Sequence, residues 1–304
     1  MKNMQRKVIQ LAKKTLVVSL PSKWAKENNV KKGDDVEVEP EEKRLIINID
    51  KELKGEKITI NAEDLGSFDP LYIAYLYQGG IDEVKIKYKD RSVYSKTQQK
   101  LPDLMGFEIV NQGEDYMEVK NVSNALNEEF ETLMRRAYYI LEDMGKSSFE
   151  AIKEKNFSRL KDLLPLENSV DKFTDFCKRV LIKKGYKNPK KTPFYYAIIR
   201  DVEKIGDYYE EIMNYEIENK IEICKETEKL YEESNEFLQL FHQLFYKFDK
   251  EKASEFQKKK KELRARAEAL MKKVKREELF IVYNLLGLIR MTGNLYGPYY
   301  ITLI

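Results

Sequence analysis

Two pairs of carboxylates in the C-terminal half of the chain have a spacing that suits metal binding. Glu167 and Asp171 are four residues apart, and Glu203 and Asp207 repeat that spacing. Because an α-helix turns once in about 3.6 residues, each pair places two carboxylates on one helix face. If the two helices pack side by side, the four carboxylates converge, and they stay ionised together only beside a cation such as Mg²⁺, Mn²⁺, Zn²⁺ or iron.

Spacing by itself does not select these pairs. With 52 acidic residues among 304, chance alone gives about nine acid pairs at a spacing of four. Glu228, Glu232 and Glu236 form a similar series, which is typical of a solvated helix face. The context of the first two pairs therefore has to distinguish them.

The segments LENSVD (166–171) and DVEKIGDY (201–208) resemble the paired E/D-x-x-x-D motifs of the PhoU family. The resemblance covers about residues 124–304. It implies an all-α bundle of two three-helix repeats, about 123–217 and 218–304, which binds metal clusters on its surface and acts in phosphate-responsive regulation of phosphate uptake. Six amphipathic segments agree with this architecture, with breaks near Asn156, Gly185 to Pro193, Glu218, Asp249 and Arg276.

The second repeat departs from the motif. When Gly206 is aligned with Gly293, Arg290 takes the place of Glu203 and Asn294 takes the place of Asp207. We therefore expect at most one divalent or iron-type metal ion, held in the first repeat by Glu167, Asp171, Glu203 and Asp207. Arg290 is left to bind an anion, to pair with an acid or to serve the packing. The two aligned glycines indicate a close helix approach or room for a ligand.

Basic residues are concentrated at the N-terminus. The whole chain has 55 Lys and Arg against 52 Asp and Glu, but the first 32 residues hold nine basic residues and a single acid, Glu27. Such a cluster favours phosphate contacts, which release counterions and depend strongly on salt. We expect the residues that contact DNA, mostly through its backbone, to be Arg6, Lys7, Lys13, Lys14 and Lys23.

Local signals predict a compact β-rich unit around these basic residues. Leu16 to Leu20 forms an apolar strand run, Ser22 is placed to cap a short helix, and Lys31 to Asp35 predicts a turn before the next strand. Residues 1–50 resemble the SpoVT/AbrB family, which implies an intertwined, dimeric, DNA-binding β-barrel. About 50 residues bury too little surface alone, so sharing strands with a second copy is expected. A small barrel that binds a protein is the alternative.

The middle of the chain predicts a small α/β domain over residues 51–122. Strands are predicted at 57–61, 84–88, 107–110 and 116–119, and a helix at 70–77. Gly79-Gly80 is more typical of a helix stop than of a phosphate cradle. The result is a multidomain α+β protein divided at about 1–50, 51–122 and 123–304, and the middle domain serves dimer contact, ligand sensing or spacing.

Composition favours a cytoplasmic protein without membrane insertion. Hydrophobic residues make up 42% of the chain and the mean hydropathy is −0.61. The apolar stretch 279–289 is too short to span a bilayer, and no secretory signal is visible. Cys177 and Cys224 have no CxxC or histidine partner, which indicates reduced thiols.

Taken together, the parts resemble phosphate uptake regulators of the archaeal type. We expect a homodimer or larger assembly that binds double-stranded DNA, with phosphate-transport or signalling proteins as further partners, and no enzymatic activity. One alternative is a non-DNA-binding adaptor that docks on a phosphate transporter or kinase. The other is a carboxylate metal-dependent hydrolase, which is weakened because His242 is the only histidine.

Overall fold

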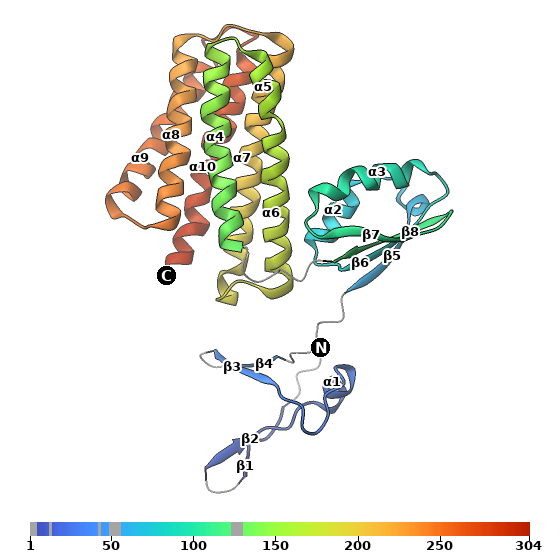
Figure 1. The fold of residues 1–304 in the computed structure, drawn as a ribbon. Helices are drawn as coiled ribbons and strands as arrows, with labels where there is room; N and C mark the ends of the chain where they lie inside the picture. The colour runs from blue at the N-terminus through green and yellow to red at the C-terminus, as the bar shows by residue number, and fades with distance from the viewer. Residues whose placement is uncertain (1–4, 12–13, 42–43, 49–55, 123–129) are drawn as a thin grey trace. The chain divides into compact units, whose positions relative to one another are not determined.

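The structure is a computed structural model that describes residues 5–11, 14–41, 44–48, 56–122 and 130–304. The fold is mixed α+β, with short strands at the N-terminus and a helical bundle at the C-terminus (Figure 1). The chain divides into two compact units, residues 1–55 and residues 56–304. The α/β segment and the helices belong to the same unit, and the three-part division at 1–50, 51–122 and 123–304 stays a prediction.

The first unit consists of two antiparallel hairpins separated by a short helix. In chain order its elements are β1 (Ile9–Leu11), β2 (Thr15–Val17), α1 (Ser22–Glu27), β3 (Glu37–Glu41) and β4 (Arg44–Asn48). β2 is shorter than predicted because β1 offers only three partners, from Ile9 opposite Val17 to Leu11 opposite Thr15. The predicted cap is wrong: Pro21 lies at the N-cap of α1, Ser22 is its first helical residue, and no side chain caps the helix.

The predicted turn before β3 is confirmed. Gly33 has a φ of 96°, a conformation that favours glycine. Asp34 closes the turn, since its carboxylate accepts a hydrogen bond of 2.9 Å from the Lys31 amide. Its own amide donates to the Lys31 carbonyl over 3.1 Å. The chain is thus reversed between α1 and β3 by local contacts alone.

The first unit has no buried side chain among its described residues. Its apolar strand residues face solvent instead, with exposed fractions of 55% for Ile9, 69% for Leu16 and 64% for Leu45. Exposing this much apolar surface on short strands is unfavourable in water. The strands therefore need a covering surface that this single chain's first unit does not supply.

The α/β segment is a four-stranded sheet in the order β5-β6-β8-β7, with β5 and β6 parallel and the remaining pairs antiparallel. Figure 1 shows α2 and α3 on the same side of this sheet. The elements are β5 (Lys57–Asn61), α2 (Leu71–Gln78), β6 (Glu83–Lys87), α3 (Ser92–Lys100), β7 (Phe107–Gln112) and β8 (Tyr116–Asn121). Gly79 ends α2 and Gly80 has a φ of 88°, which confirms the helix stop.

The C-terminal bundle contains seven helices within residues 130–304. They are α4 (Phe130–Lys153), α5 (Phe157–Leu163), α6 (Pro165–Lys184), α7 (Thr192–Asn219), α8 (Lys225–Tyr246), α9 (Lys250–Leu270) and α10 (Leu279–Leu303). The predicted breaks lie in the connections between helices or within one or two residues of them, and the longest of these connections separates α9, which ends at Leu270, from α10, which begins at Leu279. The second predicted segment is divided at Leu164 and Pro165 into α5 and α6. Pro165, at the first turn of α6, explains this division because proline has no backbone N–H to donate to α5 and its ring clashes with the preceding turn.

Helix α6 joins the bundle to the α/β segment through a buried arginine. The guanidinium of Arg179 donates hydrogen bonds to the carbonyls of Tyr77 (2.8 Å) and Ile81 (2.7 Å), at the end of α2. The Gln78 amide donates to the Asp175 carboxylate, also on α6, over 2.8 Å. These contacts fix α6 against α2, and the same helix carries two of the predicted metal ligands.

Candidate metal centre and DNA-contact residues

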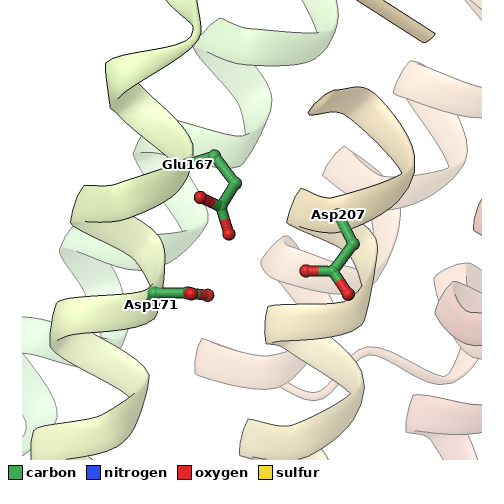
Figure 2. A group of neighbouring side chains, drawn as sticks. All are labelled: Glu167, Asp171 and Asp207. Atoms are coloured by element: carbon green, nitrogen blue, oxygen red, sulfur yellow. The ribbon is translucent and has the colours of Figure 1, made fainter. Parts of the chain in front are cut away.

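Two neighbouring helices bring three of the four predicted carboxylates together. Glu167 and Asp171 lie one turn apart on α6, and Asp207 lies on α7. One oxygen from each carboxylate lies within 4.8 Å of the others. Figure 2 shows all three side chains directed into the space between the two helices. We call these three residues the acidic group.

Without a cation, burial makes the ionised forms of these carboxylates unfavourable. Glu167 is buried, and Oδ1 of Asp171 is shielded from solvent without a hydrogen-bond partner among the described residues. Loss of solvation raises the pKa of Asp171, and the nearby carboxylates of Glu167 and Glu203 raise it further. The pKa of Glu167 is also raised, chiefly by burial. A cation between the helices would reverse both effects by stabilising the ionised forms.

The donor set of the acidic group suits a hard cation. It offers carboxylate oxygens only, which Mg²⁺, Mn²⁺ and Ca²⁺ prefer, and it includes one oxygen that lacks any other partner. Lys204 lies beside the group, and its Nζ donates to the Asp207 carboxylate over 2.6 Å. The Lys204 side chain is half-exposed, so it can move away from Asp207 at small cost.

Glu203, the fourth predicted ligand, lies outside the acidic group. Its carboxylate accepts a hydrogen bond from Nζ of Lys178, a buried residue of α6. The same Nζ lies 3.3 Å from the carboxylate of Asp175. Burial raises the pKa of Glu203, and the Lys178 ammonium opposes that rise. The lysine thus supplies the positive charge that this carboxylate needs.

Sequence reasoning missed Asp175 and Lys178, although a signal for them is present. Asp175 continues the spacing of Glu167 and Asp171 by one more turn of α6, and Lys178 follows three residues later. A lysine one turn after an acid is an ordinary surface pattern, so it does not by itself indicate burial. Only the packing of α7 against α6 makes it a buried ion pair.

Arg290, which replaces Glu203 in the second half of the bundle, pairs with an acid. Its guanidinium lies 3.1 Å from the Glu268 carboxylate on α9. Of the expected roles of Arg290, pairing with an acid is thus the one that the structure shows. The aligned Asn294 is exposed on α10. Within the described ranges, the acidic group on α6 and α7 is the one cluster of potential ligands found.

The aligned glycines have packing roles. A Cβ at Gly206 would lie 3.5 Å from Leu141 and 3.6 Å from Val170, which are ordinary contact distances. A Cβ at Gly293 would lie 2.8 Å from Cε of Lys260, whose Nζ donates to the Gly293 carbonyl over 2.7 Å. Close approach of the Lys260 side chain therefore accounts for Gly293, whereas the packing around Gly206 would accept a Cβ at ordinary contact distance.

His242 is a core residue of α8. Its Nδ1 lies 2.6 Å from the Glu142 carboxylate, and its ring stacks on Tyr138 with the centroids 4.9 Å apart. The buried imidazole thus has a hydrogen-bond partner for Nδ1 and an aromatic ring packed on its face. His242 is thus engaged with residues of α4 and is not a member of the acidic group.

Four of the five predicted DNA-contact residues are exposed in the first unit. Arg6 and Lys7 precede β1, Lys14 lies in the turn between β1 and β2, and Lys23 lies on α1. Nζ of Lys23 is 3.8 Å from the Glu27 carboxylate, an exposed pair that contributes little. Lys13 lies outside the described residues. The four exposed side chains have the access to solvent that phosphate contacts require.

Comparison with known proteins identifies the class of the first unit. Residues 9–54 match the family model described as "Antidote-toxin recognition MazE, bacterial antitoxin". The N-terminal segment is therefore a MazE/AbrB-like domain, in agreement with its resemblance to SpoVT/AbrB domains. No curated protein matches the chain. The match does not extend to residues 56–304, so the resemblance of the bundle to PhoU stays a prediction. None of the described helices is both long and apolar enough to cross a membrane.

Proposed function

We propose that the protein is a DNA-binding transcription regulator of phosphate uptake, in which two copies pair through their first units. The observation that carries the proposal is the match of residues 9–54 to the MazE antitoxin family model. The first unit, which contains these residues, buries none of the side chains of its described residues. Domains of this type are dimeric and bind DNA. A second copy would cover the exposed apolar strands and present the basic residues twice.

The basic residues would supply affinity through the DNA backbone. Each of Arg6, Lys7, Lys14 and Lys23 is exposed, and a dimer carries two of each. Neutralised phosphates release counterions, so binding should weaken steeply as salt rises. Sequence preference would have to come from base contacts or DNA shape in addition.

Fluorescence anisotropy of the full chain tests this proposal. The probe is labelled DNA from upstream of phosphate-transport genes, with a scrambled competitor, across a salt series. We expect preferential binding that weakens about a thousandfold or more between about 50 and 200 mM salt. The variant Lys7→Gln/Lys14→Gln should reduce the salt slope by about four in a dimer.

The matched control is Lys258→Gln/Lys261→Gln, which removes the same charge from exposed positions of α9. It should leave the salt slope unchanged. Binding no tighter than to the competitor, or an equal effect of both double variants, would overturn the DNA-binding proposal. An adaptor whose first unit only dimerises it would then be the better account.

We further infer that the PhoU-like bundle senses the phosphate state or docks a phosphate-transport or signalling protein, with a divalent or iron-type ion held by Glu167, Asp171 and Asp207. No catalytic step is needed. Coupling between two sites is typically worth about 1–3 kcal/mol, which corresponds to about 5–150-fold in affinity. The DNA dissociation constant measured with and without Mn²⁺ and phosphate should change within that range, and an unchanged value would refute the coupling.

A second candidate is an antitoxin-type regulator that recognises a protein toxin. The name of the matching family favours it. An antitoxin needs no response of DNA binding to metal or phosphate. DNA affinity that is tight but indifferent to both would therefore favour this second candidate.

A further inference from the structure

A cavity of about 520 Å³ lies in the second half of the bundle, where α8 begins and α9 leads into α10. Its apolar lining comes from Ala269, Leu270 and Val274, at the end of α9 and just beyond it. Cavities between about 300 and 1,000 Å³ with such linings are the usual size for small organic ligands. None of the acidic group's residues lines this cavity, so it is a separate feature of the bundle.

The charged residues around the cavity are mostly basic. Four cations, Lys229, Arg266, Lys273 and Lys275, face two acids, Glu226 and Glu278. The buried Glu278 is already engaged, because its carboxylate accepts a hydrogen bond of 2.9 Å from the Cys224 amide. Within the part of the chain that the structure describes, Arg266 pairs with Glu233 and Lys275 lies near Glu222.

Lys229 and Lys273 are the cations without such partners. Their ammonium groups make no ion pair or hydrogen bond with any described residue. Lys229 lies on the first turns of α8, and Lys273 lies in the connection between α9 and α10. They therefore reach the same cavity from two different segments, which is the arrangement that holds an anionic group between two donors.

We propose that this cavity binds a small organic anion that combines an anionic group with an apolar part. Lys229 and Lys273 would bind the anionic group, and Leu270 and Val274 would contact the apolar part. Inorganic phosphate fits less well, because it is much smaller than the cavity and would leave these apolar side chains uncovered. The proposal does not depend on DNA binding or on a metal in the acidic group.

The first test is fluorescence anisotropy of 1-naphthyl phosphate with the full chain. This probe carries a phosphate and an aromatic ring of the size that the cavity accepts. We expect saturable binding that weakens about tenfold or more in Lys229→Gln/Lys273→Gln, since two charge-assisted contacts are lost. The matched control is Lys225→Gln/Lys272→Gln, which changes exposed residues of the same two segments that do not line the cavity.

The affinity of the control variant for the probe should be within about twofold of that of the unchanged chain, because the charges it removes lie outside the cavity and are screened by salt. Equal weakening in both double variants, or no saturable binding to the unchanged chain, would overturn the proposal. Competition separates the two halves of the ligand. Displacement of the probe by an equal concentration of inorganic phosphate would overturn the requirement for an apolar part, and failure of inorganic phosphate to displace the probe at that concentration would support it.

The apolar half has its own variant. Val274→Asn changes a half-buried residue of the lining without altering charge. It should weaken 1-naphthyl phosphate binding about threefold or more, in keeping with the loss of apolar contact. If a folded Val274→Asn chain binds 1-naphthyl phosphate as tightly as the unchanged chain, Val274 does not contact the apolar part of the ligand and this assignment is overturned.

Discussion

The guanidinium of Arg179 on α6 donates a hydrogen bond of 2.5 Å to the carboxylate of Asp82, which precedes β6. Nζ of Lys183, one turn further along α6, lies 2.5 Å from the same carboxylate. The Arg179 side chain is only 1% exposed. One carboxylate thus pairs with two cations at the junction of the bundle and the α/β segment. The helix that forms this junction also carries Glu167 and Asp171.

Removal of the Asp82 carboxylate should strongly destabilise the second unit. Asp82→Ala leaves the buried guanidinium of Arg179 without its counter-charge, and breaking a buried pair typically costs about 3–5 kcal/mol. Urea unfolding of the full chain should show this loss. Asp115→Ala, the same substitution at an exposed position, should change the free energy of unfolding by less than about 0.5 kcal/mol. Similar losses in both variants would contradict the role of the junction.

Metal binding should distinguish Asp171 from Glu203. Asp171→Asn removes a carboxylate of the acidic group, so Mn²⁺ affinity measured by isothermal titration should fall by about tenfold or more. Glu203→Gln should leave the affinity within about threefold, because Glu203 is held by Lys178. If the two variants lose Mn²⁺ equally, all four carboxylates act together and the three-residue group is wrong.

Glu216 should make stability depend on pH. Its side chain is fully buried, and burial raises its pKa to about 7, with Glu278 adding to the rise. The unfolded chain ionises this group near pH 4.5, so the stability present below that pH is lost as the pH rises through 7. The full difference is about 3 kcal/mol.

The measurement is the free energy of unfolding at pH 4.5 and pH 8 in Glu216→Gln and in Glu218→Gln. Glu218 is exposed two residues further along α7. The fall in stability between the two pH values should be about 3 kcal/mol smaller in Glu216→Gln than in Glu218→Gln and in the unchanged chain, because the raised pKa values of the other buried carboxyls are common to all three chains. A fall of the same size in both variants would show that another group is responsible.

Leu16→Lys should weaken self-association. Leu16 is 69% exposed on β2, and a dimer that covers it gains about 1.5–3 kcal/mol from each copy. Sedimentation of the full chain should therefore show dimer dissociation at a concentration at least about a hundredfold higher than for the unchanged chain. Tyr75→Lys, at an exposed apolar position of α2, is the control and should leave the association constant unchanged. Equal behaviour of the two variants would place the dimer contact elsewhere.

Much of the fold follows from short-range patterns in the sequence. The helix breaks at Asn156 and Asp249 were predictable because their side chains cap the helices that follow. The turn at Gly33 was predictable because few other residues adopt its φ. α3 escaped prediction, because its nine residues are mostly polar and only Val93 and Thr97 are buried. Its place is fixed by the sheet beneath it rather than by its own periodicity.

The candidate metal centre, like the fold, was predictable only where it depends on short-range geometry. The spacing of Glu167 and Asp171 determined that both carboxylates share one face of α6, because helix geometry is set within four residues. Which α7 carboxylate meets them depends on how α7 lies against α6 and α4, where a Cβ at Gly206 would meet Val170 and Leu141. Only the tertiary structure decided that Asp207 joins the acidic group while Lys178 binds Glu203, since contacts between helices depend on the packing of the whole core.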